Sequence, residues 1–251
     1  MKKVSIIIAA YFGQRNAFHS KYADDKLFYM KKQLEYCNNI SNQLHKIYIP
    51  CTFDDSVDKD KIIQELKTYK FNKDFIIYER ENIGGSYCSW HTALQIDNGD
   101  SDFIILLEDD YLIDSEIVIP AMLNYWNIDP DLLYLCQLWQ EETIWHEKYQ
   151  TYLPPHAGMS AGILNNKLYH QLKTEKTLDF NLMYTPSNEF SERFSYMVEN
   201  QKSFLDAYRL AGYKIKDWRK EASSYFPHDD VDYGKDGGHK MLTPIIEKFI
   251  N

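Results

Sequence analysis

The sequence predicts an α/β fold, in which a mostly parallel sheet is flanked by helices within a single domain. Short apolar runs alternate with segments whose apolar residues recur at helical spacing, through roughly the first 110 residues. The first run, VSIIIAAYF, is rich enough in isoleucine for a strand that is buried on both faces, as in parallel sheets. No internal repeat, low-complexity segment or linker divides the chain, which favours one domain.

The first half of the chain is expected to supply four strands and three helices. The first predicted helix, for example, carries Leu27, Met30, Leu34 and Cys37 at helical spacing. Because strands joined through helices run parallel, their carboxyl ends should share one edge, where ligands bind in such sheets. In chain order, we predict strands over residues 4–12, 45–52, 75–79 and 103–107, and helices over 24–40, 59–69 and 86–96.

The alternation becomes less regular in the second half of the chain. Residues 139–162 are aromatic and polar and contain two adjacent prolines, which predicts a long functional loop or a hairpin. Its tryptophans and tyrosines would suit stacking on a sugar, or equally packing of this segment onto the sheet. The remaining predicted elements are a helix over 117–126, a strand over 132–138, a short strand passing into a helix over 163–172, a helix over 188–211, a strand over 214–218 and a final loop over 225–240.

Charge and composition exclude several classes of partner. The formal net charge is −9 at pH 7, which argues against nucleic acid or an anionic membrane, since both require a basic face. No stretch approaches the ~20 apolar residues of a membrane span. The opening MKKVSIIIAAYF superficially resembles a signal peptide, but no small-x-small cleavage pattern follows it. The four cysteines lack the spacing of a zinc site or a disulfide framework, so we expect free thiols and a cytoplasmic protein.

Three consecutive carboxylates, Glu108, Asp109 and Asp110, directly follow the predicted strand over 103–107. Adjacent carboxylates repel, and burying them without compensation is costly. They could begin a solvated loop, cap the following helix, or bind Mg²⁺ or Mn²⁺, which prefer oxygen ligands. Their place at the carboxyl end of an apolar strand favours the cation.

Four motifs in order resemble the GT-A glycosyltransferases, most closely those of family 2. They are VSIIIAAYF, CTFDDS, ENIGG and FIILLEDDYLID. The family has a first strand of the form VSIIIPxYN, an acidic DDGS-like turn, an N-x-G segment before a helix, and a metal-binding D-x-D after its fourth strand. The resemblance covers residues 4–114 and continues more weakly to about 215. It implies a Rossmann-like GT-A domain over 1–251, with the nucleotide-sugar donor bound by 1–114 and the acceptor by 115–251, which end in a lid-like tail.

The resemblance also implies the residues of the donor site. Glu108 matches the first acid of D-x-D, which faces the donor ribose, and Asp110 would hold the Mn²⁺ or Mg²⁺ that bridges the two phosphates. Asp54 and Asp55 match the acidic turn that accepts a hydrogen bond from the nucleobase. The other implied donor-binding residues are Ala9, Ala10, Tyr11, Asn82, Gly84, Gly85, Ser86 and Asp109.

Three departures from the family pattern leave the donor open. Ala9 stands in place of the family's proline, Phe12 in place of its asparagine, and Ser89, Trp90 and His91 where an Arg-Asn pair is often found. We expect a UDP-sugar, with a GDP-sugar as the alternative, and a glycan or another hydroxyl compound as acceptor.

The second half should provide a general base and complete the metal site. An inverting enzyme needs an Asp or Glu that takes the proton of the acceptor hydroxyl. Glu189 is preferred because SNEF is typical of a helix N-terminus, with Glu192 in reserve and Glu199 as a third candidate. His228 matches a late histidine that completes the metal shell in several GT-A enzymes; an ordinary loop histidine is the alternative.

The expected activity is therefore metal-dependent sugar transfer, and two other functions remain as alternatives. A sugar nucleotidyltransferase would need a glycine-rich, basic loop after the first strand, whereas AYFGQRNAF has one glycine and one arginine. A catalytically inactive carbohydrate- or partner-binding protein of the same fold would have no reason to keep three repelling carboxylates together.

Overall fold

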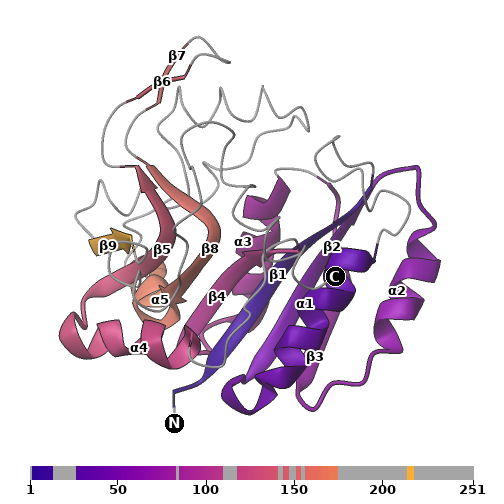
Figure 1. The fold of residues 1–251 in the computed structure, drawn as a ribbon, viewed down its shortest axis with the longest axis horizontal. Coiled ribbons are helices and arrows are strands. Elements are labelled where there is room, and N and C mark those ends of the chain that lie inside the picture. The colour runs from indigo at the N-terminus through magenta and orange to yellow at the C-terminus, as the bar shows by residue number, and fades with distance from the viewer. Residues whose placement is uncertain are drawn as a thin grey trace, which may run out of the picture.

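A seven-stranded sheet with the strand order β3-β2-β1-β4-β8-β5-β9 forms the centre of the protein in the computed structural model (Figure 1). Its strands are β1 (Val4–Phe12), β2 (Lys46–Phe53), β3 (Asp74–Glu79), β4 (Phe103–Glu108), β5 (Leu132–Gln140), β8 (His156–Asn165) and β9 (Lys214–Asp217). The structure describes residues 2–13, 27–82, 85–109, 118–140, 144–146, 151–153, 156–174 and 214–217.

Most neighbouring strands of this sheet are parallel, as predicted. β1 lies between β2 and β4 and is parallel to both, with Ile6 opposite Ile47 on one side and Ile105 on the other. β2 and β3 are also parallel, as are β5 and β9. Only β8 runs antiparallel to its neighbours, β4 and β5, within the part of the sheet that the structure describes. The carboxyl ends of β1 to β4 consequently lie along one edge.

Helices cover both faces of the sheet and bury two hydrophobic cores. One core joins the sheet to the first set of helices through residues such as Met30, Ile62 and Trp126. The other joins it to the second set through Trp90 and Tyr169. The first set is α1 (Phe28–Asn39), α2 (Lys59–Lys67) and α4 (Val118–Ile128), and the second is α3 (Gly85–Asp97) and α5 (Asn166–Thr174); a 3-10 turn, η2 (Ser41–Gln43), precedes β2. The α/β fold is thus confirmed, with helices on both faces (Figure 1).

The segment after β5 differs from its prediction. A small antiparallel pair, β6 (Ile144–His146) and β7 (Thr151–Leu153), agrees with the hairpin alternative. The expected loop through residue 162 was wrong at its end, because β8 already begins at His156. Its first seven residues, HAGMSAG, are mostly small and lack an apolar pattern. The predicted helix over 188–211 and loop over 225–240 lie outside the described residues.

Close packing explains a glycine within β8. A Cβ added at Gly162 would collide with the ring and hydroxyl of Tyr134 and lie 2.8 Å from the carbonyl oxygen of Leu135. Glycine within a strand often marks such a close approach. Tyr134 is fully buried there, so this glycine lets an aromatic side chain of β5 lie across its neighbour.

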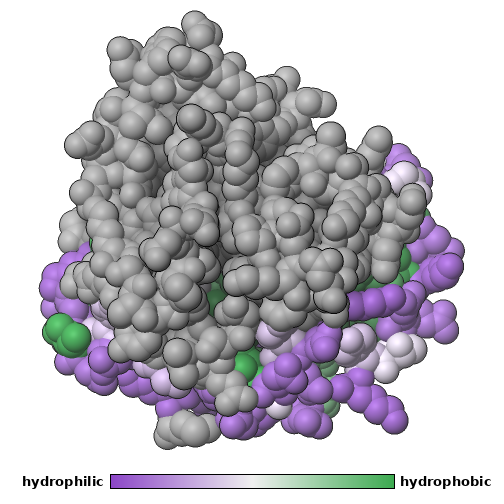
Figure 2. Space-filling model, viewed as in Figure 1, coloured by the Kyte–Doolittle hydropathy of each residue, from purple (hydrophilic) through white to green (hydrophobic). Residues whose placement is uncertain are grey.

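The described surface is mostly polar. Ile96 and Ile128 are the large hydrophobic residues that are exposed among the described ones, at 45% and 74%. In Figure 2 the described part of the visible face is largely hydrophilic, with small separate hydrophobic spots. No helix of the described ranges is both long and apolar enough to cross a bilayer. Cys37, Cys51 and Cys88 are free thiols, as predicted.

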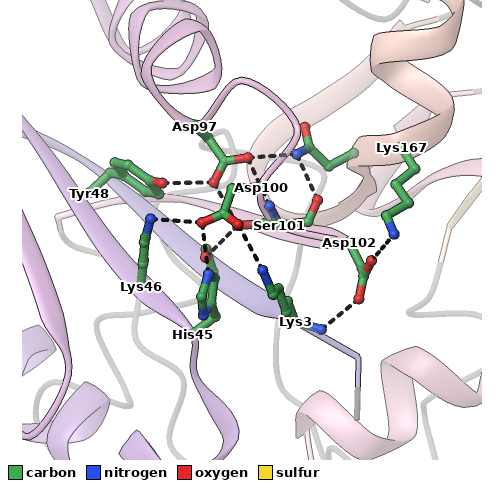
Figure 3. A network of polar contacts seen from close by, with 11 residues as sticks. Lys3, His45, Lys46, Tyr48, Asp97, Asp100, Ser101, Asp102 and Lys167 are labelled. Atoms are coloured by element: carbon green, nitrogen blue, oxygen red, sulfur yellow. Dashed lines mark hydrogen bonds and ion pairs between the residues drawn. The ribbon is translucent and has the colours of Figure 1, made fainter.

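A buried carboxylate fixes the C-terminal end of α3 to the amino ends of the strands (Figure 3). Asp97 is only 4% exposed and accepts hydrogen bonds from the Tyr48 hydroxyl at 2.7 Å, the Ser101 hydroxyl at 2.6 Å and the Asn166 amide at 2.8 Å. Because its partners come from β2, the loop before β4, and α5, one carboxylate holds three segments together.

A second carboxylate beside it gathers cationic groups. Asp100 accepts from the ammonium groups of Lys3 at 2.8 Å and Lys46 at 2.7 Å, and His45 Nε2 lies 2.9 Å from it (Figure 3). Lys3, followed by Lys46 and His45, holds the pKa of this carboxyl well below its usual range.

Replacing Asp100 by asparagine should make the free energy of unfolding less dependent on pH in the acidic range. A depressed folded-state pKa stabilises the fold above the ordinary carboxyl value of 3.8, and this contribution is lost as the pH falls through the lower folded-state value. We expect Asp100→Asn to lower the free energy of unfolding at pH 7, with a difference from wild type that shrinks below pH 4. Urea unfolding of both proteins at a series of pH values measures this difference.

Asp131→Asn is the matched control, since the Asp131 side chain is 83% exposed. It should leave both the stability and its pH dependence nearly unchanged. A destabilisation by Asp100→Asn that stays constant from pH 7 to pH 2 would contradict the ion-pair explanation.

Candidate functional site

The candidate site is the edge formed by the carboxyl ends of β2, β1 and β4. Tyr11 pairs with Thr52 of β2, while Ala9 pairs with Glu108 of β4, so the strand ends lie at one level. Asp54 directly follows β2, and Asp109 directly follows β4. The structure therefore brings together donor-binding residues predicted from three separate motifs.

A chain of hydrogen bonds crosses these strand ends. The backbone N–H of Tyr11 donates to the carboxylate of Asp109 at 3.1 Å, and the Tyr11 hydroxyl donates to Asp54 at 3.0 Å. Tyr11 is 98 residues from Asp109 and 43 from Asp54 in sequence, so only the fold can join them. We call this arrangement the Asp109–Tyr11–Asp54 chain.

Asp109 shows how one of the three consecutive carboxylates is compensated. It is only 4% exposed, and its own N–H donates to the carbonyl oxygen of Ala9 at 3.2 Å. Its side chain then accepts from the N–H of Tyr11, two residues further along β1. The carboxylate thus extends the pairing of β1 with β4 beyond the end of the strand, and these hydrogen bonds offset part of the cost of burial.

Both carboxylate oxygens of Asp54 accept hydrogen bonds from neighbouring residues of the protein. One carboxylate oxygen accepts from Tyr11, and the other accepts from the backbone N–H of Ser56 at 2.9 Å and from its hydroxyl. The neighbouring Asp55 is exposed. Of the two acids in this turn, Asp55 is therefore the one whose side chain faces solvent, whereas Asp54 shapes the turn.

Ala9 and Ala10 are buried rather than exposed at the edge. They are 6% and 2% exposed, and their side chains belong to the two opposite cores. Their contacts at the edge come from the backbone, because the Ala10 carbonyl accepts from the Thr52 hydroxyl at 3.1 Å and the Ala9 carbonyl accepts from Asp109.

The N-terminus of α3 borders the edge on its other side. Gly85 opens the helix with a φ of 58°, a left-handed conformation that favours glycine. The hydroxyl of Ser86 donates to the carboxylate of Glu108 at 2.5 Å, and the indole N–H of Trp90 donates to the carbonyl of Leu107 at 2.9 Å. Both bonds join α3 to the end of β4. The free N–H groups and the dipole of a helix N-terminus favour an anion.

Two residues of the site were missed by the sequence analysis. A Cβ at Gly13 would collide with the Tyr11 ring and the Asp54 carboxylate, so glycine leaves room for these two side chains to meet. Arg80 follows β3 and donates to the carbonyl of Gly85 at 3.3 Å and to the Ser89 hydroxyl at 3.0 Å. A glycine right after a strand could have indicated the first; nothing in the local pattern indicates the second.

Several predicted residues cannot be located at the edge. Asn82 is half-buried and lies in the chain segment between β3 and α3. Gly84, Asp110, Glu189, Glu192 and His228 lie outside the described residues, and so does Glu199. Among the residues that are described, no group of three His, Cys, Asp or Glu side chains could hold a metal ion. The two residues predicted to hold the metal, Asp110 and His228, are not among the described residues.

Comparison with known proteins gives distant overlaps only. No protein-family model matches the sequence, and no curated protein is detectably similar to it. A cytidylyltransferase from Leptospira borgpetersenii overlaps with a TM-score of 0.46 at 15% identity, over 100% of this chain and 96% of that one. A 4-diphosphocytidyl-2C-methyl-D-erythritol synthase from Anaerococcus prevotii gives 0.47 at 12% identity, over 86% of each chain. A mannosyltransferase from Pyrobaculum calidifontis, in complex with GDP-Man and Mn²⁺, gives 0.44 at 12% identity, over 85% and 54%. Overlaps of this size do not define a family.

Gly13→Ala should break the hydrogen bond between Tyr11 and Asp54, because the new methyl group displaces one of the two side chains. We expect it to destabilise the protein by about 1–3 kcal/mol. Tyr11→Phe removes the same bond without adding bulk. The two changes should therefore be non-additive in urea unfolding, with a coupling free energy of roughly 1 kcal/mol. Strictly additive effects would show that Gly13 and the Tyr11–Asp54 bond act independently.

Proposed function

We propose that the protein is a transferase that binds a nucleotide-sugar at the carboxyl edge of its parallel strands. The more specific activity proposed is metal-dependent transfer of the sugar from a nucleoside diphosphate to an acceptor hydroxyl. The observation that carries the proposal is the Asp109–Tyr11–Asp54 chain, which joins three motifs that separately resemble the donor site of GT-A enzymes.

The charge at the edge differs between its two sides: the side of α3 suits a diphosphate, and the side of the turn after β2 does not. The N-terminus of α3, with Ser86 in its first turn, supplies N–H groups suited to phosphate oxygens. The turn after β2 carries the exposed carboxylate of Asp55, which suits a nucleobase with N–H donors. We therefore propose that the base lies toward Asp55, the ribose near Glu108, and the phosphates toward α3.

A divalent cation fits the chemistry of the acidic motif. Carboxylate oxygens are the ligands that Mg²⁺ and Mn²⁺ prefer, and Glu108 and Asp109 stand beside the proposed phosphate position. Asp110, with His228, is proposed to hold the ion. When bound, the ion would neutralise the charge that develops on the departing diphosphate. In the protein itself, Ser86 fixes the carboxylate of Glu108, while Tyr11 fixes that of Asp109.

The acceptor step is proposed to be a direct displacement with inversion. The acceptor oxygen forms a bond to the anomeric carbon as the bond from that carbon to the diphosphate breaks. A carboxylate of the second half takes the proton of the acceptor hydroxyl. Glu189 is the proposed base, with Glu192 as the alternative, and a UDP-sugar is the proposed donor ahead of a GDP-sugar.

Thermal unfolding with UDP, GDP, dTDP or CMP, each with and without Mn²⁺, tests the donor site. A nucleotide that binds only the native state adds about 2.7 kcal/mol at 100 times its dissociation constant, which gives a clear shift in Tm. We expect one nucleotide to stabilise the protein in a manner that needs Mn²⁺ and is lost in Asp110→Asn. The control Asp131→Asn removes an exposed carboxylate from the opposite end of the sheet and should keep the shift.

The products formed distinguish the alternatives. A glycosyltransferase slowly hydrolyses its nucleotide-sugar and releases a nucleoside diphosphate. A sugar nucleotidyltransferase would instead release pyrophosphate from a nucleoside triphosphate and a sugar phosphate, which would overturn the proposed reaction but keep the nucleotide site. Folded protein that responds to none of the nucleotides would refute the donor site and favour a binding protein.

A further inference from the structure

Arg80 connects the end of β3 to two neighbouring elements. Its backbone N–H donates to the carbonyl of Cys51 in β2 at 2.9 Å. Its guanidinium group reaches the other way, to the first turn of α3, where the same Nη1 donates to the Gly85 carbonyl and to the Ser89 hydroxyl. One residue thus ties the strand ends to the helix that borders the candidate site.

This is a costly place for a cation. The partial positive charge of a helix N-terminus opposes an arginine, whereas it would favour an anion. Burial is also unfavourable and lowers the pKa of Arg80. Hydrogen bonds to Gly85 and Ser89 offset part of this cost, which indicates that the geometry of the contact matters more than the charge alone.

The contact with Gly85 determines the direction of the next N–H. Because a peptide unit is planar and trans, fixing the carbonyl of Gly85 also fixes the N–H of Ser86, which points the opposite way. Glycine has little steric preference of its own, and Gly85 lies at a φ of 58°. The Ser89 hydroxyl donates to the same carbonyl at 3.3 Å, and Arg80 donates to that hydroxyl. The orientation of the Gly85–Ser86 peptide is therefore fixed by the side chains of Arg80 and Ser89.

The other side of the same turn is also held. The Ser86 hydroxyl donates to Glu108 at the end of β4, so the first turn of α3 is fixed by Arg80 through Gly85 and by Glu108 through Ser86. The N–H of Ser86 lies between these two attachments, at the position proposed for the donor phosphates.

We propose that Arg80 is a positioning residue for the phosphates of the donor, acting through the Gly85–Ser86 peptide. This inference rests on the proposed function. It predicts that the strongly hydrated ammonium group of lysine, on its flexible stem, cannot replace the planar guanidinium group, whose Nη1 serves both acceptors.

The test compares the affinity for a nucleoside diphosphate with that for its nucleoside, measured by titration calorimetry on the full chain. The probes are UDP with uridine and GDP with guanosine. We expect Arg80→Gln and Arg80→Lys each to weaken binding of the diphosphate roughly five- to tenfold, while nucleoside binding is unchanged. Ser89→Ala, which keeps the cation but removes one acceptor, should give a smaller loss of the same kind.

Lys59→Gln is the matched control. Lys59 is an exposed cation at the same end of β3, bonded to Glu79 at 2.8 Å, and it does not bond to α3 among its described contacts. Its loss should leave both affinities unchanged. Wild-type affinity in Arg80→Lys would show that charge alone matters, and an equal loss for nucleoside and diphosphate would show a general structural role; either result overturns the inference. A wild-type protein that binds no nucleotide would instead refute the proposed function itself.

Discussion

The hydrogen bond from the Tyr11 backbone to the buried carboxylate of Asp109 is the contact on which the rest of the candidate site depends. It continues the pairing of β1 and β4 past the end of the strand and so fixes the direction in which the Tyr11 hydroxyl reaches Asp54. It also explains how a strand can end in consecutive carboxylates. Successive side chains point to different sides, so Asp109 is bound within the edge while Glu108 meets Ser86.

Helix α3 links this edge to the stability of the whole sheet. Its last residue, Asp97, is buried among hydrogen-bond donors at the amino ends of the strands, and its first turn is held by Arg80 and Glu108 at the carboxyl ends. A helix fixed at both ends presents its N-terminal N–H groups with little freedom, which is the preorganisation that binding of an anion requires. The contacts of Asp97 at one end of the sheet, and those of Arg80 and Glu108 at the other, therefore both set the position of α3.

Local pattern and motif order were enough to predict the first four strands. They also indicated that Tyr11, Asp54 and Asp109 share one edge, because parallel strands bring their carboxyl ends together. The contribution of Arg80 could not be predicted, since it depends on the path from β3 to α3 and not on a periodic pattern. The start of β8 was missed because its first seven residues, HAGMSAG, are mostly small and carry no apolar signature. The roles of Glu189, Glu192, Asp110 and His228 remain predictions.

Backbone amide shifts in a nitrogen-15 NMR titration with UDP or GDP and Mg²⁺ would test the central claim most directly. If nucleotide binds where the Asp109–Tyr11–Asp54 chain joins the strand ends, the amides of Tyr11, Ser56, Ser86 and Asp109 will shift, while that of Ser101 at the opposite edge stays in place. Shifts at Ser101 with none at Tyr11 or Ser86 would contradict the account.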